Sequence, residues 1–88
     1  MNELLPIGSV VKLKGSPSHL MIIGHGSIQS EEQTHYDYLA INYPFGLGDS
    51  MDSIMFDRES IESVLHKGYA DEEAKVYYRA VDKIIKKI

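Results

Sequence analysis

Alternating apolar and polar positions in the first two thirds of the chain predict a series of short β-strands. Residues 9–14 alternate and are rich in β-branched side chains, with a glycine on either side. Residues 19–24 are apolar at successive positions, which is typical of a strand covered on both faces. Residues 36–43 give the strongest pattern, with apolar or aromatic side chains on both faces. Two shorter stretches, at 53–56 and 61–66, complete a prediction of four to five strands.

Glycine, proline and polar residues separate these strands. The stretch from Gly24 to Glu32 is polar and predicts a loop after the second strand. Proline and glycine predict a second turn over 44–49. Residues 58–65 also fit a short helix, and the pattern leaves this alternative open beside the fifth strand.

A different spacing begins near Asp71 and predicts an amphipathic α-helix over residues 72–87. Asp71 can accept hydrogen bonds from the first free amides of a helix, and Glu72 and Glu73 suit the positive end of its dipole. Apolar side chains then recur at intervals of three and four, and they are Ala74, Tyr77, Tyr78, Val81, Ile84, Ile85 and Ile88. We expect this apolar face to pack on the sheet, because an isolated helix of this length is marginally stable in water.

Together these elements predict an α+β fold over residues 1–88, arranged as one domain. It is an antiparallel meander of four to five strands with one C-terminal amphipathic helix. The strand order, with a short turn before the last strand, also matches a small SH3-like barrel with a helix added. A chain of 88 residues is long enough for one such domain and too short for two.

The amino-acid composition argues against several classes of function. Thirteen acidic and nine basic residues give a formal net charge of −4, whereas nucleic-acid binding needs a basic surface. The basic cluster Lys83, Lys86 and Lys87 is typical of a helix C-terminus, where cations suit the dipole. The chain has no cysteine, no signal-peptide pattern and no stretch near the ~20 apolar residues of a membrane span. We therefore expect a cytoplasmic protein that binds neither nucleic acid nor membrane.

The four histidines are the candidates for a metal site. His25 and His35 flank the predicted loop, so a hairpin would bring them across from each other, with Asp37 or Glu32 as a further ligand. Their spacing matches no short metal-binding pattern. The other two histidines stand at strand ends, where such side chains are usually solvated. We expect no catalytic residues, no metal and no cofactor, and a small metal-dependent hydrolase is the weakest alternative.

Aromatic side chains gather on and just after the third strand, and they suggest a contact surface. Tyrosine and phenylalanine are enriched at protein interfaces. The predicted protein-binding residues are Tyr36, Tyr38, Tyr43, Phe45 and Leu47. A place in the core is the alternative for Tyr38 and Tyr43. An exposed face of this kind also allows two copies to pair as a homodimer.

Several short motifs extend through most of the chain. They read LLPIGSVVKLKG at 4–15, LMIIG at 20–24, YDY at 36–38 and GYADEE at 68–73. Together they resemble a small domain-of-unknown-function family of Gram-positive bacteria. His25 is a departure, because many members of that family carry arginine there.

The resemblance implies a function that the residue pattern does not. Genes of that family commonly stand beside those of type VII secretion systems and LXG toxins. The resemblance therefore implies a cytoplasmic accessory factor, an adaptor or chaperone that binds a cognate LXG toxin and helps to direct it to export. An immunity protein that neutralises the toxic domain is the alternative. The family has no established catalytic residues that could be assigned to positions of this chain.

Overall fold

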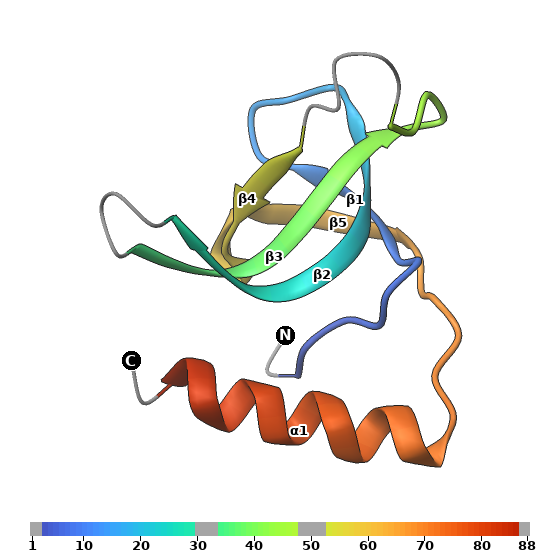
Figure 1. Ribbon diagram of the computed structural model, residues 1–88. Coiled ribbons are helices and arrows are strands. Elements are labelled where there is room, and N and C mark those ends of the chain that lie inside the picture. The colour runs from blue at the N-terminus through green and yellow to red at the C-terminus, as the bar shows by residue number, and fades with distance from the viewer. Residues whose placement is uncertain (1–2, 30–33, 48–52, 87–88) are drawn as a thin grey trace.

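The computed structural model describes residues 3–29, 34–47 and 53–86, and in them an antiparallel sheet is followed by one α-helix (Figure 1). The sheet order is β4-β3-β2-β1-β5. This confirms the predicted α+β class and the antiparallel meander. The elements are β1 (Val10–Leu13), β2 (His19–Gln29), β3 (Thr34–Tyr43), β4 (Ile54–Phe56), the 3₁₀ turn η1 (Arg58–Ser60), β5 (Ile61–His66) and α1 (Glu72–Lys86).

The largest error of prediction lies after Gly24, where a loop was expected. β2 instead continues to Gln29, opposite Thr34, with a register shift between Ile22 and Gly24. The length of the strand was predicted from its apolar side chains alone. Pairing with β3 continues beyond them because backbone hydrogen bonds do not require apolar side chains. The rest of the predicted loop, 30–32, lies outside the described residues.

The other boundaries agree more closely. β1, β3 and β4 differ from the predicted ranges by one or two residues at an end, and β5 matches its range. The short helix that was the alternative over 58–65 is reduced to the single turn η1, and strand β5 follows at once. This short turn before the last strand is the element order expected of an SH3-like barrel.

The two edge strands approach each other because their connection is short. Only Asp57 and η1 separate the end of β4 from the start of β5. Figure 1 shows the resulting curl of the sheet, which encloses a core on its inner face. Cross-strand neighbours share a face, and the register pairs Val11 with Leu20, Ile22 with Ala40 and Tyr38 with Phe56. All six side chains are buried.

An N-terminal arm closes the open end of the curled sheet. In Figure 1 residues 3–7 run between α1 and the strands. Leu4 and Leu5 join the core, and the Leu5 amide donates a hydrogen bond of 2.9 Å to the Tyr38 hydroxyl. The Ile7 amide donates to the Tyr78 hydroxyl at 3.2 Å. The arm therefore links the sheet to the helix.

Helix α1 begins as predicted but buries only part of its apolar surface. The Ala74 amide donates to Oδ1 of Asp71 at 2.8 Å, which caps the first turn. Tyr78, Val81 and Ile85 pack against the core. Tyr77 and Ile84, which were expected to face the sheet, are 62% and 60% exposed. Within the described residues no helix is long and apolar enough to span a membrane.

Two chain segments cross with almost no space between them where β1 begins. Gly8 has a φ of +93°, which suits glycine, and its amide donates to the Ile22 carbonyl at 2.9 Å. Gly68 passes directly over it, and the Gly68 amide donates to Oγ of the buried Ser9 at 2.9 Å. This crossing fixes the segment that leads from β5 to α1.

Candidate functional site

The predicted protein-binding residues divide into buried and exposed members. Tyr38 is fully buried and its hydroxyl is engaged by the arm, so it is not accessible to a partner. Tyr36 is half-buried. Tyr43, Phe45 and Leu47 are 49%, 83% and 53% exposed. The end of β3 and the turn after it therefore remain as the exposed part of that prediction.

Tyr43 also borders an apolar groove on the outer face of the sheet. We name this the groove surface, and it is lined by Gly8, Val10, His19, Met21, Tyr43, Leu65 and His66. The register explains why these residues meet: Val10 lies opposite both Met21 and His66, and His19 lies opposite Tyr43. Residues opposite each other point to the same face of a sheet. The groove surface thus spans β5, β1, β2 and the end of β3.

A second apolar surface lies on the side of α1 that faces away from the sheet. We name it the outer stripe, and it comprises Val76, Tyr77, Ala80 and Ile84, all exposed. Spacings of three and four residues align them along one side of the helix. The sequence signal for this surface was present, because α1 carries eight apolar side chains, which is more than one face of a helix can bury. The pattern alone did not show which of them would be left outside.

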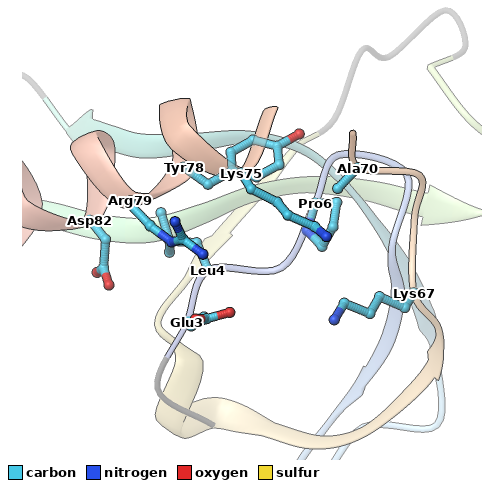
Figure 2. Close-up of a pocket in the computed structure, with 9 residues that line it drawn as sticks. All are labelled: Glu3, Leu4, Pro6, Lys67, Ala70, Lys75, Tyr78, Arg79 and Asp82. Carbon is cyan, nitrogen blue, oxygen red and sulfur yellow. The ribbon is translucent and has the colours of Figure 1, made fainter. Parts of the chain in front are cut away.

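Basic side chains border the outer stripe. Lys75, Arg79 and Lys83 are exposed and follow one another at intervals of four along α1. A shallow pocket lies beside them, between α1, the arm and the segment after β5. Figure 2 shows Lys75 and Arg79 reaching from the helix over this pocket, with Lys67 on its far side. The pocket is also lined by Glu3, whose carboxylate faces the cations of Lys67, Lys75 and Arg79.

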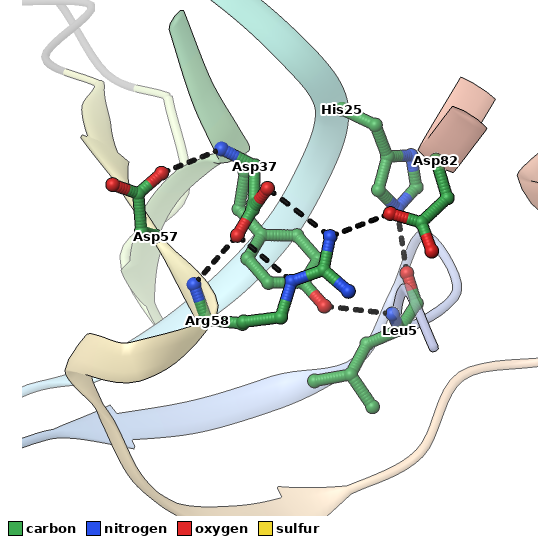
Figure 3. Close-up of polar contacts among 7 residues, drawn as sticks. Leu5, His25, Asp37, Asp57, Arg58 and Asp82 are labelled. Carbon is green, nitrogen blue, oxygen red and sulfur yellow. Dashed lines mark hydrogen bonds and ion pairs between the residues drawn. The ribbon is translucent and has the colours of Figure 1, made fainter. Parts of the chain in front are cut away.

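A buried ionic network connects the helix to the sheet (Figure 3). The Arg58 guanidinium donates to Asp37 on β3 at 2.9 and 3.2 Å, and to Asp82 on α1 at 2.7 Å. Their side chains are 13%, 9% and 14% exposed. The Asp37 amide in turn donates to Oδ1 of Asp57. Both aspartates raise the pKa of Arg58 above its ordinary value by hydrogen bonding to the charged form. The network joins β3, η1 and α1, and its groups are engaged with one another.

His25 takes part in the scaffold. Its Nε2 lies 2.5 Å from the Leu5 carbonyl oxygen, and since a carbonyl only accepts, Nε2 carries the proton. The ring lies between Tyr38 and Tyr78, with ring centroids 5.7 and 4.9 Å away. Burial lowers the pKa of His25, and the hydrogen bond to Leu5 opposes this shift only in part.

The lowered pKa predicts a pH dependence of stability. In the unfolded chain His25 takes up a proton near pH 6.5, whereas in the folded chain it does so only at lower pH. The unfolded state therefore binds more protons between these two values, and the free energy of unfolding falls as the pH drops below about 6.5. We expect His25→Gln, whose amide can still donate to Leu5, to flatten this slope. Urea denaturation of both proteins at a series of pH values measures it, and identical slopes would contradict the assignment.

The groove surface and the strand register give the places of the other histidines. His19 and His66 lie on the groove surface, and His35 pairs in register with Ile28, three positions along the β2–β3 ladder from the His25–Tyr38 pair. Among the residues that the structure describes, no three His, Asp or Glu side chains are grouped to hold a metal ion. Glu32 and the side chain of His35, which belong to the candidate metal set, lie outside the described residues.

Comparison with known proteins places the chain in a family. No curated protein and no solved structure gave a significant match. A family model described as "Domain of unknown function (DUF4176)" matches residues 4–76. That range covers the arm, the whole sheet and the first turn of α1, and it contains the motifs on which the resemblance rested. The chain therefore belongs to the DUF4176 family of domains of unknown function.

Proposed function

We propose that this protein is a non-catalytic accessory factor of the cytoplasm that binds another protein, and that its partner is a type VII secreted LXG toxin. In this role it is an adaptor or chaperone that holds the toxin before export. The proposal rests on the exposed apolar surfaces for protein binding. It rests on the family resemblance for the kind of partner.

The observation that carries the binding function is the amount of apolar surface left outside the core. Ten large apolar side chains among the described residues are exposed, and Phe45 and Tyr69 are each 83% exposed. Scattered exposed residues need no explanation, but here most gather in two sets, along the outer stripe and at the groove surface with the adjoining turn. Aromatic side chains in such sets are typical of interfaces.

The scaffold beneath these surfaces is suited to binding with little rearrangement. The outer stripe lies on a helix that is held by the Arg58 network and by the Tyr78 hydroxyl. The groove surface lies on paired strands. A preorganised surface loses less conformational entropy on binding.

Co-expression tests the proposal. The affinity-tagged chain is expressed with the product of the adjacent toxin gene, and in parallel with its secretion domain or its toxic domain alone. We expect the whole toxin and the secretion domain to co-purify with the tagged chain. Retention of the toxic domain alone would instead identify an immunity protein. Absence of all three from the purified sample would contradict the proposal.

A further inference from the structure

The outer stripe and the basic side chains beside it form one surface with a defined chemistry. Val76, Ala80 and Ile84 give the stripe an apolar line with a small residue at its centre. A small residue there permits the close approach of another helix. Tyr77 adds an aromatic ring that is 62% exposed. The stripe continues over more than two turns of α1, which is the length over which a second helix can pack.

Three cations line one border of the stripe, and the acidic Glu72 stands at its N-terminal end. Lys75, Arg79 and Lys83 lie at successive intervals of four, and like charges at this spacing destabilise a helix slightly. Lys75 has an ion pair with Glu72 at 3.6 Å, and Glu72 itself is 93% exposed. Lys67 approaches from the segment after β5 and extends the positive border (Figure 2). This concentration of cations occurs in a chain whose formal net charge is −4.

We infer that α1 is the docking surface for an amphipathic helix of the partner, whose apolar stripe is bordered by acidic side chains. The apolar residues of that helix cover Val76, Tyr77 and Ile84. Its carboxylates lie along Lys75, Arg79 and Lys83. The inference deepens the proposed function and rests on it for the identity of the partner.

The charges disfavour a second copy as the occupant. In an antiparallel pair of identical helices the same border of each helix meets the other, so Lys75, Arg79 and Lys83 would face their own counterparts. A membrane surface is a poorer match for a different reason. An anionic lipid surface is negative along the whole helix and therefore also meets Glu72 and Glu73 in the first turn, whereas a partner helix can place its carboxylates beside the three cations only.

Synthetic peptides test this chemistry without the natural partner. Two labelled helical peptides of about 20 residues share one apolar stripe, and one carries glutamate along its border where the other carries lysine. We expect fluorescence anisotropy to show at least about tenfold tighter binding of the glutamate peptide, and about 0.5 M NaCl to remove most of the difference. Arg79→Glu with Lys83→Glu should reverse the preference. Equal affinities, or no binding of either peptide, would overturn the inference.

Matched variants locate the surface in the natural complex. Ile84→Glu should weaken co-purification of the toxin at least about tenfold, while Tyr69→Glu, at an 83% exposed side chain outside both apolar surfaces, should not. Lys83→Glu should weaken it more than Lys14→Glu, which also changes an exposed lysine. If Phe45→Glu abolishes binding and Ile84→Glu does not, the protein still binds the toxin as proposed, but the inference that α1 is the docking surface is overturned.

Two further measurements test the other possible occupants of the surface, which are a second copy of the chain and a membrane. We expect light scattering to show a monomer, and a dimer that Ile84→Glu dissociates would overturn the inference. We expect no sedimentation with vesicles of phosphatidylglycerol. Vesicle binding that Arg79→Glu with Lys83→Glu abolishes would overturn it as well.

Discussion

Replacing Arg58 with methionine should destabilise the protein by about 3–5 kcal/mol, because it removes the cation between two buried carboxylates. Asp37 and Asp82 are 9% and 14% exposed, so neither can recover full hydration in the folded state. The variant also loses the attachment of α1 to β3. A loss of this size is a large part of the stability of a small domain. Urea denaturation followed by circular dichroism measures it.

A surface ion pair is the matched control. Lys12 is paired with Glu62, but these side chains are 33% and 49% exposed. Lys12→Met should therefore cost less than about 1 kcal/mol. Adding Asp37→Asn and Asp82→Asn to Arg58→Met should recover part of the loss, because the uncompensated charges disappear. Equal losses for Arg58→Met and Lys12→Met would show that the network contributes little to the fold.

Replacing Gly68 with alanine should cost about 3 kcal/mol, because the added methyl group has no space. Its Cβ would lie 2.9 Å from the Ser9 nitrogen and 3.0 Å from the Gly8 carbonyl carbon, and closer still to the Ile7 carbonyl oxygen. These are backbone atoms, and they cannot move away without breaking the hydrogen bond from the Gly8 amide to the Ile22 carbonyl. Thermal and urea denaturation measure the loss.

Gly24→Ala supplies the comparison for this crossing. A Cβ at Gly24 would meet the Leu39 side chain at 3.6 Å, which is an ordinary contact. We expect its stability to stay within about 1 kcal/mol of the wild type. A Gly68→Ala protein as stable as Gly24→Ala would show that the two segments can separate at little cost.

Local patterns predicted the strands and the helix because each pattern reports the side chains of its own segment. The apolar alternation at 36–43 and the Asp71 cap were sufficient for β3 and for the start of α1. The extension of β2 to Gln29 was missed because its signal lies in pairing with β3, not in its own side chains. The long-range contacts of the arm were missed for the same reason.

The candidate site was predicted less well because exposure is a property of the whole fold. Tyr38 and Tyr43 look alike in sequence, yet one is fully buried and the other is 49% exposed. Tyr38 is accommodated in the core because the Leu5 amide, from the far N-terminal arm, meets its hydroxyl. On α1, Tyr77 and Tyr78 are neighbours, and only the position of the sheet decides that Tyr78 packs inward.

Calorimetric titration of the purified wild-type chain into the secretion domain of the proposed LXG toxin partner tests whether this protein binds that toxin directly. We expect a saturable complex with a fixed stoichiometry and a negative heat-capacity change, because apolar surface is buried on binding. The same titration with Ile84→Glu should show at least about tenfold weaker affinity. A wild-type chain that gives no binding at concentrations up to about 100 μM would contradict the proposed complex.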